Sequence, residues 1–210
     1  MLMCAICLLQ SSSSQAQTNE DLTLVADFAI RDALPQSPVP VAEWAAMKGW
    51  GPKAAAYPAV AVPAGREPVA WKRARVLAVA KKYIGLPYRH HHIPGWVPAA
   101  EADPKAAGKG LDCSNFTAWV YNYGLGIKFT SDIAKQSEGK EAPGRVLAAG
   151  EPLAAGDLLF ILKGDRTCVS HVVLYMDAEH IIDSHADGVA IRRFTGWYRT
   201  HLSHTRRLLE

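Results

Sequence analysis

The 210-residue chain has few cysteines, no cluster of basic residues and no long apolar run beyond its N-terminus. Cys4 and Cys7 lie in the apolar N-terminal segment, so only Cys113 and Cys168 remain, too few for a disulfide framework. A single Cys113–Cys168 bridge is the alternative to two free thiols. A membrane span needs about 18 consecutive apolar residues, and we expect none. The net charge of +3 is mild, which argues against nucleic acid as a partner.

The N-terminus has the composition of a targeting segment. Residues 1–17 contain an apolar run followed by Ser and Gln residues, with small residues that fit cleavage after Ala16. No Lys or Arg precedes the run, which departs from an ordinary secretory signal. We nevertheless expect export. Residues 18–68 follow as a proline-rich extension, in which helical spacing of apolar residues predicts helices over 20–34 and 41–47.

The remaining chain changes its hydrophobic period from helical to alternating. Helices come first and strands after, which favours an α+β fold with N-terminal helices packed on an antiparallel sheet of about five to six strands. The predicted helices cover 70–84, 113–123 and 132–138, and the predicted strands cover 157–162, 170–175, 180–184, 189–194 and 204–209.

Cys113 opens the second of these helices, after Asp112. A helix N-terminus presents unpaired N–H groups and a partial positive charge, which stabilise a thiolate and predict a lowered pKa for the Cys113 thiol. The same N–H groups can hold an oxyanion. Asp112 is a candidate N-cap. These features predict a nucleophile, and the alternative is a buried structural cysteine.

His171 begins an apolar strand, and Asp183 lies on the next strand. A rigid strand end suits a general base, and Asp183 could accept the ring N–H of His171 and fix its tautomer. His185 shares a face with Asp183 by strand alternation and competes for this role. A structural histidine and a surface aspartate are the alternatives.

Five motifs in order resemble the NlpC-type peptidases, papain-like cysteine endopeptidases of bacterial cell-wall peptides. The motifs are Tyr-Ile-Gly-Leu-Pro-Tyr-Arg (83–89), Asp-Cys-Ser (112–114), Gly-Asp-Leu-Leu-Phe (156–160), Ser-His-Val-Val-Leu-Tyr (170–175) and the strand that ends in Asp183. The resemblance implies a papain-like core and a peptidase domain over residues 69–210. It implies Cys113 as the nucleophile, His171 as the base and Asp183 at a third position where the family often has His, Asn or Gln.

The resemblance also implies a substrate and a location. Tyr88, with Asp112 and Ser114, is expected beside the nucleophile, in contact with substrate or oxyanion. Asn115 replaces the usual glycine and is expected to add a side chain near the cleft. The expected partners are peptidoglycan stem peptides, typically cut between D-glutamate and a diamino acid, in the periplasm or outside the cell, with no cofactor. A related amidase or transpeptidase, a catalytically silent wall-binding module and a toxin delivered to rival bacteria are the alternatives.

The loop over residues 86–110 departs most from the family. It carries three adjacent histidines, whose side chains diverge, and no zinc-ligand spacing surrounds them, so we expect no metal. We expect His90, His91, His92 and Trp96 to form a wall of the cleft, with Trp96 offering a flat apolar surface or else packing on nearby prolines. The remaining aromatic and basic residues of the last strands are expected in the core or rim (Trp197, Tyr198) and on solvated strand faces (Arg192, Arg193).

Overall fold

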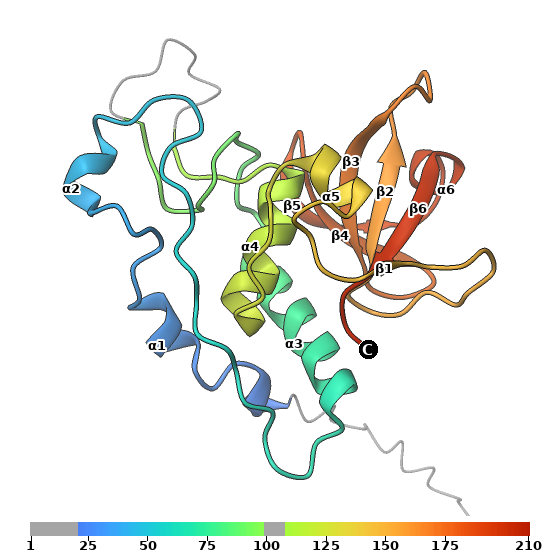
Figure 1. The fold of residues 1–210 in the computed structure, drawn as a ribbon, viewed down its shortest axis with the longest axis horizontal. Helices are drawn as coiled ribbons and strands as arrows, with labels where there is room; N and C mark the ends of the chain where they lie inside the picture. Colours follow the sequence, from blue (N-terminus) through green and yellow to red (C-terminus); the bar gives the residue numbers. More distant parts are fainter. Residues whose placement is uncertain (1–20, 99–107) are drawn as a thin grey trace, which may run out of the picture.

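The computed structural model describes residues 21–98 and 108–210, and residues 1–17 of the signal-like segment lie outside this part. The fold is α+β, as predicted, with helices on an antiparallel sheet of six strands in the order β1-β6-β2-β3-β4-β5 (Figure 1). None of the described helices is both long and apolar enough to cross a bilayer. The helical elements are η1 (Leu22–Leu24), α1 (Phe28–Asp32), α2 (Val41–Trp44), α3 (Pro68–Lys82), α4 (Cys113–Leu125), α5 (Ile133–Glu138) and α6 (Trp197–Thr200), and the strands are β1 (Arg145–Val146), β2 (Leu158–Leu162), β3 (Val169–Tyr175), β4 (His180–His185), β5 (Gly188–Arg193) and β6 (Leu202–Arg207).

Side-chain caps define where the main helices begin. Glu67 accepts hydrogen bonds from two backbone N–H groups at the start of α3, and Asp112 accepts one from Asn115 at the start of α4. Gly126 ends α4 in the left-handed conformation, φ 73°, where a Cβ would lie 2.7 Å from the backbone nitrogen of Ala59. Glycine is therefore required there both by its backbone angles and by the close approach of the extension.

Two apolar cores lie on opposite faces of the sheet. The larger one joins α3 and α4 to alternating residues of the sheet, among them Phe160, Val172 and Leu174. The smaller one lies on the other face, where Ile161 and Val173 pack with residues near α6. Because successive strand residues point to opposite faces, β2, β3 and β4 each contribute buried residues to both cores.

Strands β3 and β4 separate from each other toward one end of the sheet. Their backbone pairing is confined to Leu174 with Ile182 and Tyr175 with Ile181. The loop before α4 lies against β4 beyond this point, since Ser184 Oγ donates to the carbonyl of Leu111 at 2.7 Å. The start of α4 is thereby held at the splayed end of two strands.

The extension packs along the side of α3 and α4 that faces away from the sheet (Figure 1). Two buried arginines hold it there. Arg31 donates to the carbonyl groups of Tyr123 and Pro58, and Arg75 of α3 donates to the carbonyl groups of Gly124 and Leu24. Guanidinium groups that bridge two segments through buried carbonyls stabilise both segments together.

Two differences from the predicted elements have local causes. The helix predicted over 20–34 is divided into η1 and α1. The guanidinium of Arg75 donates a hydrogen bond to the carbonyl of Leu24. The backbone N–H of Phe28 donates instead to the carbonyl of Val25, at 3.0 Å. The short elements β1 and α6 were not predicted, because two to four residues are too few to show a period.

Candidate active site

Cys113 is the first residue of α4 and is buried, with 6 % of its surface exposed. Its thiol is free, as is that of Cys168. The backbone N–H groups of Val172 and Ser114 lie close enough to its sulfur to lower the pKa of the thiol. Val172 directly follows His171, so the sulfur of Cys113 lies against the backbone of β3 next to His171.

The electrostatics at Cys113 differ from the sequence expectation. Burial, followed by the negative charge of Asp112, raises the pKa of the Cys113 thiol to about 12, although the N–H groups of Val172 and Ser114 act in the opposite direction. The prediction of a lowered pKa is therefore wrong for this resting state. Desolvation of the sulfur outweighs the stabilisation that the helix terminus provides. A thiol in this setting needs a base to take its proton.

His171 and Asp183 form a close hydrogen bond at the splayed end of β3 and β4. Nε2 of His171 lies 2.6 Å from Oδ2 of Asp183, and both side chains are buried. Since Asp183 occupies Nε2, Nδ1 is the ring nitrogen that remains for another partner. The same carboxylate oxygen accepts a hydrogen bond from the hydroxyl of Tyr198 at 2.9 Å.

Asp183 is also paired with Arg192 of β5, whose Nε lies 2.6 Å from Oδ1. Burial favours the protonated acid, but the hydrogen bond with His171 and the ion pair with Arg192 prevail and lower the pKa of Asp183. Sequence reasoning missed Arg192, which was expected on a solvated face, and Tyr198. The signal for Arg192 was available, because in a β4–β5 hairpin Arg192 pairs with Ile181 and is a diagonal neighbour of Asp183.

His185 lies beside His171 without a hydrogen bond to it. The two rings meet edge to face with centroids 5.1 Å apart. Burial and the neighbouring His171 lower the pKa of His185. Of the two candidates for the partner of His171, it is Asp183 whose side chain is bonded to the ring.

The residues around the nucleophile candidate form a buried capping network. Asp112 Oδ1 accepts from the N–H of Asn115, and the Asn115 amide donates to both oxygens of Asp112 at 3.0 Å. Ser114 Oγ donates to Asp112 at 3.2 Å, and its carbonyl accepts from Gln136 of α5. The Asn115 side chain is thus held against Asp112, the residue directly before Cys113.

An aromatic row leads from the extension to the vicinity of Cys113. Trp50 packs against His90 with ring centroids 4.9 Å apart, and His90 packs edge to face against Tyr88 at 5.4 Å. His90 Nδ1 lies 3.4 Å from Asp112. Burial, with the charges of Cys113 and Asp112, raises the pKa of Tyr88. Tyr88 therefore lies near Cys113, as expected, and the row continues into a residue of the extension that sequence reasoning had not singled out.

The expectation that His91 and Trp96 line the cleft is corrected by their burial, whereas His90 is exposed and His92 is partly exposed. Trp96 is 1 % exposed, donates from Nε1 to the carbonyl of Trp44, and lies so close to Gly51 that a Cβ there would meet its ring at 2.3 Å. His91 is buried edge to face against Trp96, and burial lowers its pKa to about 4. Both rings pack the extension onto the core and offer no surface to a ligand.

Metal ligands are not grouped in the described part of the chain. Across residues 21–98 and 108–210, no three His, Cys, Asp or Glu side chains converge in a way that could hold an ion. His90 and His92 point to different partners, Asp112 and Asn115 respectively.

The chain is similar in sequence and in fold to proteins of one known family. A family model described as the NlpC/P60 family matches residues 96–207. An NlpC/P60 family protein from Bacillus cereus is 28% identical over 66% of this chain, with a TM-score of 0.50, and the chain spans 40% of that protein. The peptidoglycan hydrolase RipB from Mycobacterium tuberculosis is 22% identical, with 72% of this chain and 74% of that chain covered and a TM-score of 0.52. The P60 domain of antigen MAP1204 from M. avium subspecies paratuberculosis is 18% identical, with coverages of 69% and 99% and a TM-score of 0.51. A search of curated proteins finds no match.

Proposed function

Because this chain belongs to the NlpC/P60 family, we propose that it is a cysteine peptidase that hydrolyses peptide bonds in peptidoglycan stem peptides. The observation that carries the proposal is the meeting of three elements at one point. The Cys113 sulfur at the start of α4 lies against the backbone beside His171 of β3, and His171 is bonded to Asp183 of β4. A nucleophile, a base and an orienting carboxylate arranged in this way suit acyl transfer.

The reaction begins with a neutral thiol. Because burial raises the pKa of Cys113 to about 12, His171 takes the thiol proton on Nδ1 as the sulfur attacks the peptide carbonyl. The C–S bond forms and the carbonyl becomes a tetrahedral oxyanion. Asp183, kept ionised by Arg192, stabilises the imidazolium that results.

The second half of the cycle returns the proton. The oxyanion collapses, the C–N bond breaks, and His171 gives its proton to the leaving amine. Water then attacks the thioester with His171 as base, which releases the acid and restores the thiol. Backbone N–H groups at the start of α4 and the Tyr88 hydroxyl are the donors we assign to the oxyanion. No step in this cycle calls for a cofactor.

The substrate class and the location are part of the same proposal. RipB, which shares the fold, is a peptidoglycan hydrolase. The aromatic row of Trp50, His90 and Tyr88 supplies a wall on which a peptide could lie beside Cys113. We propose a D-glutamate–diamino acid bond as the target and export to the periplasm or the cell exterior, where that substrate is found.

Cleavage of purified peptidoglycan tests this function. Wild-type protein should release peptide fragments with new free amines, seen by mass analysis, and Cys113→Ala should release none, while Cys168→Ala should retain activity. Fragment release by Cys113→Ala equal to that of the wild type would exclude Cys113 as the nucleophile. New amide bonds between fragments would favour a transpeptidase.

The raised pKa of Cys113 also supports a second candidate, a wall-binding module without catalysis. The rate of alkylation by iodoacetamide at neutral pH, resolved for each cysteine by peptide mass analysis, separates the two. A base-assisted Cys113 should react faster in wild type than in His171→Ala. Equal rates, together with binding of wall material and no cleavage, would identify the binding module.

A further inference from the structure

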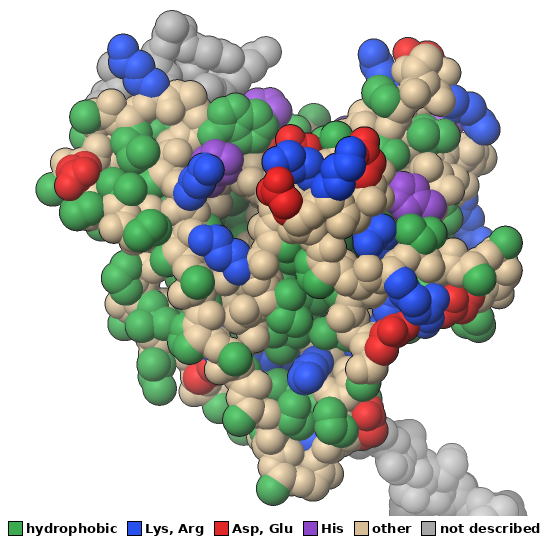
Figure 2. All heavy atoms as spheres, viewed as in Figure 1, with side chains coloured by type: hydrophobic (Ala, Val, Ile, Leu, Met, Phe, Trp, Pro, Cys, Tyr) green, Lys and Arg blue, Asp and Glu red, His purple; other side chains and the backbone are tan. Residues whose placement is uncertain are grey.

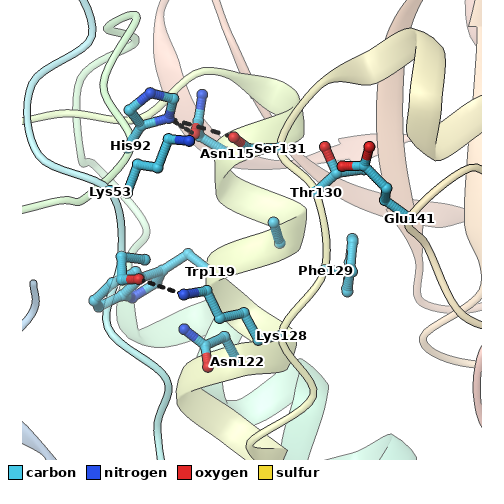
Figure 3. Close-up of a pocket in the computed structure, with 12 residues that line it drawn as sticks. Lys53, His92, Asn115, Trp119, Asn122, Lys128, Phe129, Thr130, Ser131 and Glu141 are labelled. Atoms are coloured by element: carbon cyan, nitrogen blue, oxygen red, sulfur yellow. Dashed lines mark hydrogen bonds between the residues drawn. The ribbon is translucent and has the colours of Figure 1, made fainter. Parts of the chain in front are cut away.

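A cavity of about 530 Å³ lies along α4, between the extension and the segment that follows α4 (Figures 2 and 3). Its volume is in the range of small-ligand sites. Figure 2 shows basic side chains and a histidine gathered on the extension side of this hollow. The lining residues are Lys53, Ala54, His92, Asn115, Ala118, Trp119, Asn122, Lys128, Phe129, Thr130, Ser131 and Glu141.

The cavity lies on the far side of α4 from Cys113. With about 100° between successive residues of a helix, Asn115, Ala118, Trp119 and Asn122 fall roughly 140° to 240° around the axis from Cys113. Cys113 faces β3, whereas these four residues face the extension and the segment after α4. The cavity is therefore separate from the candidate active site, although both use the same helix.

The charges around the cavity favour an anion. Lys53 makes no ion pair with any described residue. Lys128 donates one hydrogen bond to the carbonyl of Ala54 at 2.8 Å and has no carboxylate partner among the described residues. Figure 3 shows the Lys53 side chain extending toward His92 and Asn115, and Lys128 crossing the cavity lower down. The one acid in the lining, Glu141, is paired with Lys135 at 2.6 Å. Two ammonium groups, from the extension and from the segment after α4, thus line the cavity without a carboxylate partner among the described residues.

The upper end of the cavity is joined to the cap of α4 by hydrogen bonds. The side-chain NH₂ of Asn115 donates to Asp112. The side-chain oxygen of Asn115 can therefore accept a hydrogen bond from Nδ1 of His92, 3.2 Å away. Ser131 Oγ lies 3.3 Å from the same nitrogen. Asp112 in turn caps the helix at Cys113. A molecule that displaces His92 or Asn115 would therefore disturb the cap directly before Cys113.

We propose that this cavity is a second binding site for a small ligand with free carboxylate groups, and that its occupancy alters the reactivity of Cys113 through the chain His92–Asn115–Asp112. Lys53 and Lys128 hold the carboxylates, and the Phe129 ring adds apolar surface. Binding at this site does not depend on Cys113 being a nucleophile, so it can hold or fail independently of the proposed function.

Titration of the full chain with triglutamate tests the site, with trialanine as an uncharged comparison and inorganic phosphate as an anion without carboxylates. Calorimetry should show saturable binding of triglutamate at one site and none of trialanine. The double substitution Lys53→Gln with Lys128→Gln should weaken this binding about tenfold or more. The control Lys48→Gln with Lys81→Gln removes the same charge from exposed positions outside the cavity and should leave binding unchanged.

Any of three results would overturn the proposal. Triglutamate could show no saturable binding at millimolar concentration, the cavity and control variants could weaken triglutamate binding equally, or the protein could bind phosphate in preference to triglutamate. The effect of the filled cavity on Cys113 is measured separately, as the rate at which iodoacetamide alkylates this cysteine. Triglutamate should change the rate at Cys113 and not at Cys168, and Asn115→Ala should abolish the change while triglutamate still binds. An unchanged rate at Cys113 with the site filled would refute this effect.

Discussion

Arg192 lies 2.6 Å from the oxygen of Asp183 that His171 does not contact, so one buried carboxylate joins a cation on β5 to an imidazole on β3. Arg192 also pairs with Asp187 in the turn between β4 and β5. The side chain of Asp183 is thereby fixed from both sides. The orientation of His171 depends on a hairpin that does not itself carry the nucleophile candidate.

Replacing Asp183 by Asn should reduce cleavage strongly without unfolding the protein. The amide can present its NH₂ to Nε2 of His171, which favours the wrong ring tautomer and withdraws the charge that stabilises an imidazolium. We expect kcat/KM to fall about 10²- to 10⁴-fold. Asp187→Asn, which touches Arg192 but not His171, is the matched control and should retain most activity. A similar loss in both variants would argue that the hairpin, and not the carboxylate on His171, is what matters.

Arg192→Gln should move the acidic limb of the pH–rate profile to higher pH. The ion pair with Arg192 contributes to the lowered pKa of Asp183, so its removal raises that pKa, and Asp183 is protonated at a higher pH than in the wild type. We expect a shift of about one pH unit. Arg193→Gln is the control, since Arg193 pairs with the exposed Glu179, and its profile should match the wild type. An unshifted limb in Arg192→Gln would mean that Asp183 does not govern the acidic side of the profile.

His91 should make the folded protein less stable in mild acid. Burial, then the charges of Arg89, His90 and His92, lower its pKa to about 4, whereas the unfolded chain has a histidine pKa of about 6.5. Its contribution to stability is therefore complete above about pH 6.5 and is lost as the pH falls toward 4, because the unfolded chain alone takes up the proton. The total is on the order of 3 kcal/mol.

His91→Phe keeps an aromatic ring against Trp96 and removes the titration. Urea unfolding at several pH values should show a shallower fall in unfolding free energy between pH 6.5 and 4 than in the wild type. His180→Phe, at a partly exposed position on β4, is the control and should keep the wild-type slope. Parallel curves for wild type and His91→Phe would show that His91 is not the group responsible.

Arg75→Met should loosen the extension from α3 and α4. Arg75 is 1 % exposed and joins the carbonyls of Gly124 and Leu24 and the carboxylate of Asp27. Removing it leaves these acceptors without their donor, and we expect a loss of about 2–4 kcal/mol of unfolding free energy. Limited proteolysis should then cut within residues 21–66 earlier than in the wild type. Lys72→Met on the same helix should change neither measurement, and equal effects would mean that the loss is one of helix charge alone.

Local patterns in the sequence predicted most of the secondary structure near the site. The start of α4 at Cys113 was predicted because Asp112 is a cap and apolar residues follow at helical spacing, both of which act within one turn. The strands that carry His171 and Asp183 were predicted because alternation and turn residues are equally local. Motif order added the family, which no single element could indicate. Boundaries such as 202–207 for β6, where 204–209 was expected, differ because strand ends are set by pairing with neighbours.

By itself the sequence determined the order of elements, the α+β class and the three chemical groups that the fold would have to bring together. Only the tertiary structure decided the environment of those groups. The pKa of Cys113 is raised, and Trp96 is buried against Gly51, because segments far apart in the sequence pack around these residues. The pairing of Arg192 with Asp183, at a site expected to be solvated, depends on register across a hairpin. Desolvation and ion pairing depend on which atoms surround a group in space, and a local pattern of residues does not contain that information.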